Sequence, residues 1–274
     1  MTIDPGTLGA HLREHQASPA AARELERAGY GTLWLDASPP AELAQAEELL
    51  DATTRLVVGT SVVNAWTAEA AAVARSYHRI EAKHPGRFLL GAGIGHREVH
   101  TEYASPYDRL TSYVDDLTAA GVPAGRIVLA ALGPRMLRLA RDRTAGTVPC
   151  LVTPEHTRRA RAVLGPGKLL LPGHFALLET DVERARALAR SQPPGTALGV
   201  TNYAANLRRL GFTDDDLAGS GSDRLIDALV AHGEPGTVAK ELRSHLEAGA
   251  DQVGVYPIGD DPIATLLAIA EALR

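Results

Sequence analysis

Short apolar runs alternate along the chain with longer segments that have helical periodicity. The apolar runs predict strands at 6–12, 32–35, 56–59, 88–90, 127–130, 147–152, 169–178 and 252–256. The intervening segments carry helix signals, as where Ser18 precedes Pro19 at a first helical position and Gly29 follows the last turn. Eight strand candidates separated by helices predict an α/β protein, a (β/α)8 TIM barrel.

One interval is longer than this alternation requires. About 75 residues separate the seventh and eighth strand candidates, too many for one crossover helix, so 198–227 predicts a helical insertion over one end of the barrel. No linker or repeat divides the chain, so we expect residues 1–274 to form a single domain. The alternative is a doubly wound sheet that binds a dinucleotide through G-x-G-x-x-G. That motif is not met, because Gly91-Ala92-Gly93-Ile94-Gly95 is followed by His96.

Composition narrows the class of partner. The chain has 274 residues, 45% of them hydrophobic, which is enough for a sizeable core. A net charge of −5 argues against nucleic acid or an anionic membrane as partner. The single cysteine, Cys150, lies in an apolar run and is expected in the core, and no signal peptide or membrane span is evident. A cytoplasmic protein that acts on a small molecule is expected.

A phosphate site is predicted where the fifth strand candidate meets the next helix. Pro134 suits a first helical position, so the free N–H groups of Arg135 and Met136 would face the barrel mouth at the positive end of the helix dipole. The Arg135 side chain can add a charge-assisted contact, and Thr153, at the end of the next strand, can add another. The alternative is an ordinary strand-to-helix turn.

Two other strand ends suit a flat ring. Ser61, Val62 and Asn64 end the third strand, and Gly93 and Gly95 end the fourth. Glycines let a ring approach the backbone closely, or they relieve crowding at the barrel rim; both interpretations stay open.

Candidates for acid–base chemistry follow the second and fourth strands. His96 and His100 are the best placed, because an ordinary histidine titrates near neutral pH. Asp36 and Ser38 end the second strand and could orient a substrate. Asp214-Asp215-Asp216 after Thr213 predict a helix N-terminus, so no metal site is expected.

Several segments together resemble the luciferase-like, F420-dependent oxidoreductases, in their actinobacterial branch. The segments are 25–34, 58–64, 84–95, 130–137, 153–157 and 206–212. Among them, P-G-R-F-L-L-G-A-G-I-G after a T-S-V-V strand end is the most specific.

The resemblance implies a barrel that binds coenzyme F420 or, in other branches, FMN. The deazaflavin ring would lie against a bulge at Ser61-Val62, where the family often has a non-proline cis peptide, and Gly93 and Gly95 would line it. The residues that would hold the phosphate of the cofactor tail are Ala130, Ala131, Leu132, Gly133 and Thr153. A homodimer is a further expectation from the family.

The chain departs from the family at the catalytic positions. Well-studied members carry a catalytic His at the end of the second strand, where this chain has Asp36-Ala37-Ser38, and sugar-phosphate-oxidising members carry Glu where it has His96. The resulting hypothesis is hydride transfer between F420 and a small organic substrate, with His96 as proton carrier. The alternatives are an FMN-dependent monooxygenase and a non-catalytic flavin-binding barrel.

Overall fold

Parallel strands and helices alternate along the chain. A computed structural model describes residues 3–95 and 105–274. The strands are β1 (Leu8–Leu12), β2 (Thr32–Asp36), β3 (Val57–Ser61), β4 (Val63–Asn64), β5 (Phe88–Gly93), β6 (Ile127–Leu129), β7 (Gly146–Thr147), β8 (Leu169–Leu170), β9 (Gly173–Leu177), β10 (Val230–His232) and β11 (Val253–Ile258). The helices are α1 (Pro19–Ala28), α2 (Ala44–Asp51), α3 (Ala70–Lys83), α4 (Pro106–Ala119), α5 (Pro134–Arg143), α6 (Pro154–Leu164), α7 (Val182–Arg190), α8 (Pro193–Thr196), α9 (Thr201–Arg209), α10 (Asp214–Leu217), α11 (Asp223–Leu229), α12 (Pro235–Glu247) and α13 (Pro262–Leu273).

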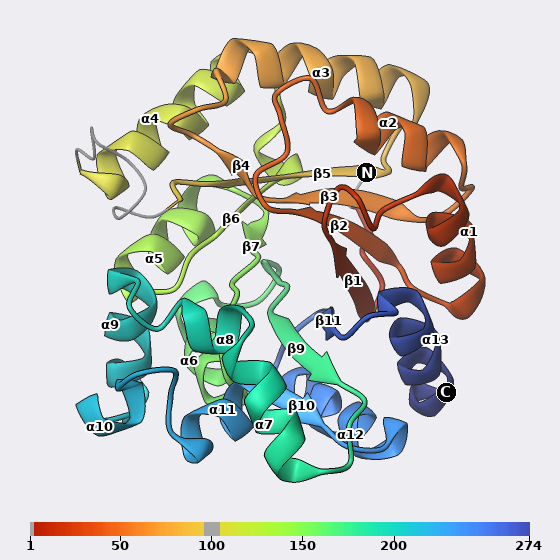
Figure 1. Ribbon diagram of the computed structural model, residues 1–274. Helices are drawn as coiled ribbons and strands as arrows, with labels where there is room; N and C mark the ends of the chain where they lie inside the picture. The colour runs from red at the N-terminus through yellow and green to blue at the C-terminus, as the bar shows by residue number, and fades with distance from the viewer. Residues whose placement is uncertain (1–2, 96–104) are drawn as a thin grey trace.

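The strands form one parallel sheet that curls on itself inside the helices (Figure 1). Their order is β10-β9-β11-β1-β2-β3-β5-β6-β7-β8, with β4 on β5. The two ends of this path meet in one stretch of chain, since β8 continues through Leu171 and Pro172 into β9. Leu171 N–H donates to Thr147 O at 2.9 Å, and Gly254 N–H donates to Pro172 O at 2.8 Å. The fold is thus the expected TIM barrel.

The structure corrects several of the predicted strands. The sixth candidate, 147–152, forms only the two-residue β7, because Pro149 has no N–H to donate and Leu151 has a left-handed backbone (φ 53°). The seventh, 169–178, is divided into β8 and β9. Strand β10, which pairs with β9, was not predicted. The interval 198–227 contains α9, α10 and the start of α11; that it is an insertion over one end of the barrel stays a prediction.

Local signals define the helix ends as the sequence indicated. Ser18 Oγ accepts a hydrogen bond from Ala21 N–H at 3.1 Å, and Gly29 ends α1 with φ 100°. Thr213 and Asp216 form a capping box at the start of α10, so the Asp214-Asp215-Asp216 run is a helix N-terminus as predicted.

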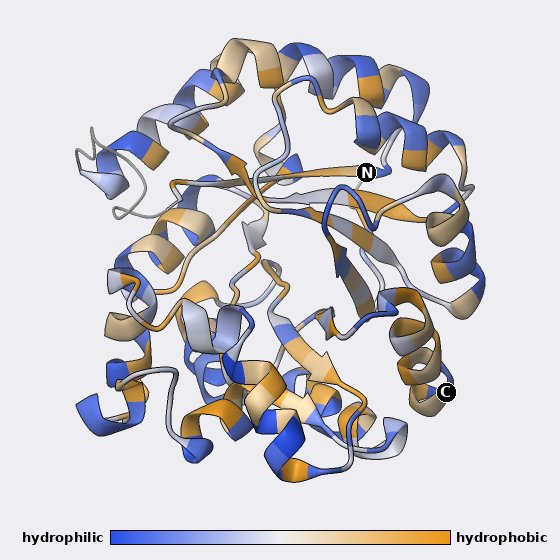
Figure 2. Cartoon of the chain, viewed as in Figure 1, coloured by the Kyte–Doolittle hydropathy of each residue, from blue (hydrophilic) through white to orange (hydrophobic). Residues whose placement is uncertain are grey.

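Hydrophobic residues follow the strands, and hydrophilic residues occupy much of the outer helices (Figure 2). None of the described helices has both the length and the apolar character needed to cross a membrane.

The lower part of the barrel interior is filled by side chains. Trp34 on β2 is fully buried, and its indole N–H donates to Gln252 Oε1 at 2.8 Å. Gly59 on β3 makes room for it, because a Cβ there would lie 2.3 Å from the Trp34 ring. His11 stacks on Tyr256 with ring centroids 3.9 Å apart. This packing fills part of the barrel interior. Open space remains toward the carboxyl ends of the strands.

Candidate functional site

A cavity of about 500 Å³ opens at the carboxyl ends of the strands. Its walls come from the ends of β2, β3, β5, β6, β7 and β11, and helix α9 covers one side. The lining includes Asp36, Ala37, Ser38, Ser61, Val62, Asn64, Ile94, Gly95, Ala130, Ala131, Leu132, Gly133, Cys150, Asn202, Tyr203, Arg209 and Tyr256. Most of the residues predicted from separate strand ends therefore meet at one cavity, in the position where TIM barrels bind their ligands.

The bulge between β3 and β4 forms one end of this cavity. The Ser61-Val62 peptide bond is cis, as the resemblance implied. Ser61 Oγ lies 3.2 Å from Tyr256 Oη on β11, and Asn64 Oδ1 accepts a hydrogen bond from Trp66 N–H at 3.0 Å. The side chains of Ser61 and Val62 both face the cavity lining, so this bulge can support one face of a planar ring.

The two predicted glycines have different positions. Gly95 lines the cavity and has φ 58°, a left-handed conformation that favours glycine. Gly93 lies buried in β5 behind the lining. A Cβ on Gly93 would lie 2.5 Å from Val62 Cγ2 and 3.2 Å from Ala130 Cβ. Gly93 thus makes room for the side chains of the cavity wall.

The start of α5 also lines this cavity. Gly133 is the N-cap and Pro134 opens the helix, and no side chain caps this end. Arg209 on α9 lies beside this helix start: its Nη2 would lie 3.5 Å from a Cβ on Gly133. Arg209 donates to Asn206 Oδ1 at 3.4 Å and has no carboxylate partner among the described residues. A helix N-terminus beside an arginine without a carboxylate is suited to binding a phosphate.

Two residues predicted for this phosphate site lie elsewhere. The Arg135 side chain does not line the cavity; its guanidinium stacks over the Tyr107 ring, 3.8 Å from the centroid. Thr153 is buried as the N-cap of α6, where its hydroxyl accepts a hydrogen bond from His156 N–H at 3.4 Å. Arg209 occupies the position that the sequence analysis gave to Arg135. The phosphate roles of Arg135 and Thr153 stay predictions.

Asp36 and Ser38 stand at the cavity as predicted. Burial raises the pKa of the Asp36 carboxyl, and the Ala37 N–H and the Arg13 guanidinium partly offset this effect. Ala37 and Ser38 have left-handed backbones, with φ 66° and 59°. Residues other than glycine rarely adopt this conformation, and it recurs at binding and catalytic sites.

The histidine candidates cannot be placed against this cavity, because His96 and His100 lie outside the described residues.

The expectation that Cys150 lies in the core is wrong: it follows β7 in an irregular segment and lines the cavity. Burial raises the pKa of its thiol to about 12, so it stays protonated at neutral pH.

The sequence analysis missed Tyr203, Arg209 and Tyr256. Tyr256 follows the pattern of the other candidates, a polar side chain at the end of a barrel strand, and this signal could have identified it. Tyr203 and Arg209 lie on α9, whose position over the barrel mouth depends on tertiary packing.

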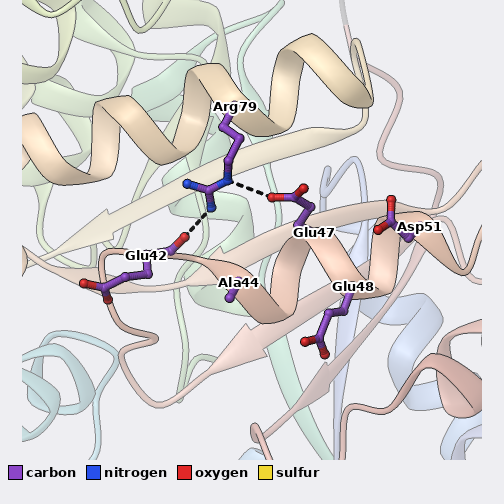
Figure 3. A pocket seen from close by; sticks show the side chains of 6 residues that line it. All are labelled: Glu42, Ala44, Glu47, Glu48, Asp51 and Arg79. Atoms are coloured by element: carbon purple, nitrogen blue, oxygen red, sulfur yellow. Dashed lines mark hydrogen bonds and ion pairs between the residues drawn. The ribbon is translucent and has the colours of Figure 1, made fainter.

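A second hollow, on the outside of the barrel between α2 and α3, has a different character (Figure 3). Arg79 Nε contacts Glu47 Oε2 at 2.8 Å, and Lys83 contacts Glu47 and Asp51 at 3.3 and 2.7 Å. These exposed charges pair with one another and contribute little to stability. The hollow shares no lining residue with the cavity at the strand ends and offers no comparable set of binding groups.

The comparisons with known proteins agree with this fold. Residues 4–120 match the family model of luciferase-like monooxygenases. The amino-terminal part of the chain therefore resembles this luciferase-like family, whose members are oxidoreductases and monooxygenases. No curated protein sequence matches the chain.

Solved structures of this fold include proteins that bind F420 and proteins that bind FMN. An F420-dependent secondary alcohol dehydrogenase, solved with an F420-acetone adduct, is 14% identical with a TM-score of 0.76 over 98% of this chain and 99% of that one. The F420-dependent tetrahydromethanopterin reductase of Methanopyrus kandleri is 15% identical, with a TM-score of 0.69 and 98% coverage of both chains. The FMN-bound oxygenating constituent of 3,6-diketocamphane monooxygenase from Pseudomonas putida is 15% identical, with a TM-score of 0.65 over 100% of this chain and 98% of that one. At these identities the likeness establishes the fold.

Proposed function

We propose that this chain is an F420-dependent oxidoreductase that transfers a hydride between the deazaflavin and a small organic substrate. One observation carries the proposal: a single cavity is lined both by the Ser61-Val62 bulge and by an uncapped helix start that lies beside Arg209. A planar ring joined by a chain to a phosphate fits this arrangement.

The residues present fit the cofactor. The Ser61-Val62 bulge and Ala130 would support the ring, and the first N–H groups of α5 together with Arg209 would hold the phosphate. The cofactor, when bound, supplies the hydride chemistry. The chain would position the substrate and handle the proton, for which His96 remains the proposed carrier, with Asp36 and Ser38 as the neighbouring polar groups.

The second candidate is an FMN-dependent luciferase-like monooxygenase. FMN also joins a flat ring to a phosphate, and a barrel of the same fold was solved with FMN bound. The third candidate is a barrel that binds a flavin without catalysis, which the missing histidine at the end of β2 would suit.

Titration of the purified chain with F420 and with FMN, followed by fluorescence, separates these functions. We expect F420 to bind at least tenfold more tightly than FMN. Tighter FMN binding would overturn the proposal in favour of the monooxygenase, and no affinity for either compound would favour a barrel without a flavin cofactor.

We expect Gly93→Ala to weaken F420 binding about three- to tenfold while the barrel still folds. The added methyl group would press on Val62 Cγ2, 2.5 Å away, and push that side chain into the cavity. F420 titration and the thermal midpoint measure the two effects. Gly125→Ala is the matched control, because a Cβ at Gly125 would have no heavy atom within 4 Å. Equal F420 affinity in both variants would remove Gly93 from the site.

A further inference from the structure

A second cavity, of about 370 Å³, adjoins the first at the barrel mouth. The two cavities share Asp36, Cys150, Tyr203 and Tyr256, which form a common wall. Because the first cavity accommodates a ring and a phosphate, this second one is available to the molecule that reacts with the ring. Its volume lies in the range usual for small-molecule sites.

Tyr256 in the common wall is held through both its ring and its hydroxyl. Its ring lies between His11 and Phe175, with centroids 3.9 and 4.8 Å away and nearly parallel planes. Its hydroxyl lies 3.2 Å from Ser61 Oγ, at the bulge proposed to support the cofactor ring. The Cys150 thiol is a second hydrogen-bond partner of this hydroxyl. When Ser61 and Cys150 both donate to the Tyr256 oxygen, the Tyr256 O–H can donate to a molecule in the second cavity.

Charge favours a neutral occupant. Burial lowers the pKa of His11 to about 3 and raises the pKa of Tyr256, so both groups are uncharged at neutral pH. The charged residues that line this cavity are Arg13 and Asp260, both exposed at its rim, and Asp36, which is partly buried and whose pKa burial raises. An anion at Tyr256 would lose its hydration without meeting a buried positive charge, and an ionised Asp36 would repel it.

The remainder of the cavity suits an apolar body. Phe175, Leu188 and Ile258 contribute to its lining, and they come from β9, α7 and β11. Apolar walls with a small number of fixed polar groups are typical of sites that bind small organic molecules.

We propose that the second cavity binds the substrate, a neutral carbonyl or alcohol compound with an apolar body, and that the Tyr256 hydroxyl holds the oxygen on its reacting carbon. This assignment rests on the proposed function, since it places the reacting carbon beside the cofactor ring. It makes Tyr256 a catalytic residue that contacts substrate, in addition to the proton carrier.

Two small-molecule probes, and a variant whose larger side chain fills the second cavity, test what this cavity binds. Cyclohexanone serves as the neutral probe and pyruvate as the anionic one, and ligand-observed NMR measures the binding of each to the chain with and without F420. We expect cyclohexanone to bind more tightly than pyruvate. Leu188→Trp should abolish cyclohexanone binding and leave F420 affinity unchanged. Val182→Trp changes another exposed apolar residue of the same helix, one that lines neither of these two cavities, and should bind as the wild type does.

The role of the hydroxyl is tested by Tyr256→Phe, which keeps the stacked ring. We expect cyclohexanone binding, measured without F420, to weaken about three- to tenfold. F420 affinity is measured separately in this variant, because Tyr256 also lines the first cavity and its hydroxyl contacts Ser61. The assignment is overturned if wild-type chain binds no cyclohexanone, if pyruvate binds more tightly, or if Leu188→Trp and Tyr256→Phe both bind like the wild type. F420 affinity is measured separately. If the wild-type chain does not bind F420, the proposed function is refuted, and ketone binding to the apoprotein still tests the assignment of the second cavity.

Discussion

Arg209→Glu is expected to weaken F420 binding by about 1.5 to 3 kcal/mol, or roughly ten- to a hundredfold. The arginine stands beside the uncapped start of α5, where it can donate charge-assisted hydrogen bonds to a phosphate. A glutamate in its place would repel the phosphate and could itself accept from the free N–H groups of the helix. Fluorescence titration of F420 at two salt concentrations measures the effect, which should diminish at high ionic strength.

Arg135→Glu is the matched control for this experiment. It makes the same change in charge within the first turn of the same helix, but Arg135 is exposed and its guanidinium stacks on Tyr107, away from the cavity lining. We expect less than about threefold loss of F420 affinity in this variant. Equal losses in the two variants would show that only the general charge of this face matters, and Arg209 would lose its assigned role.

Most of the barrel is predictable because its strands are apolar runs bounded by turn residues. The runs at β2, β3 and β5 are buried throughout most of their length, and each was predicted within a few residues. The errors have local causes. Pro149 and Pro172 interrupt the hydrogen bonding of strands that look continuous as apolar runs. Strand β10 is three residues long and directly follows α11, so no periodicity distinguishes it from the helix.

The site is predictable to the extent that it is built from strand ends. Ser61 and Asp36 each follow a predicted strand and Ala130 is the last residue of one, and a barrel brings such residues to one rim. Arg209 and Tyr203 could not be placed this way, since they reach the cavity from a helix that the sequence assigned only to an insertion. Arg135 and Thr153 have suitable chemistry at suitable positions, and side-chain direction separates them from the cavity. Sequence position locates a residue at the rim and does not determine where its side chain points.

Four histidines are buried among the described residues: His11, His156, His174 and His245. His11 is 2% exposed and stacked on Tyr256, and neither of its ring nitrogens has a hydrogen-bond partner among the described residues. His174 on β9 and His245 on α12 lie with Nδ1 and Nε2 3.0 Å apart, and Thr157 Oγ1 lies 2.8 Å from His245 Nδ1. Burial lowers the pKa of His11 to about 3 and of His174 to about 4, and it lowers the pKa of His245 as well.

The sign of the resulting pH dependence follows from proton binding. An unfolded histidine binds a proton below about pH 6.5, whereas these buried groups stay neutral until the pH reaches their lower folded values. The unfolded state therefore binds more protons between these limits, and stability is complete above pH 6.5 and falls as the pH decreases. The loss approaches 1.4 kcal/mol per pH unit for each group, about 3 kcal/mol for His11 between pH 6.5 and 4. Asp36 acts in the opposite direction near the lower limit, because its raised pKa favours proton binding by the folded state.

Urea unfolding of the chain between pH 7 and pH 4 should therefore show a steep loss of stability that His11→Phe partly removes. Phenylalanine keeps an aromatic ring against Tyr256 and cannot titrate, so the loss over this interval should decrease by about 3 kcal/mol. The comparison uses the change with pH within each variant, because a larger ring beside Gly254 can shift the stability at every pH by a similar amount. His15→Phe makes the same exchange at an exposed position and should preserve the wild-type pH dependence. If His11→Phe and His15→Phe lose stability with pH as steeply as the wild type, the acid sensitivity comes from other groups, and burial of neutral His11 is not its cause.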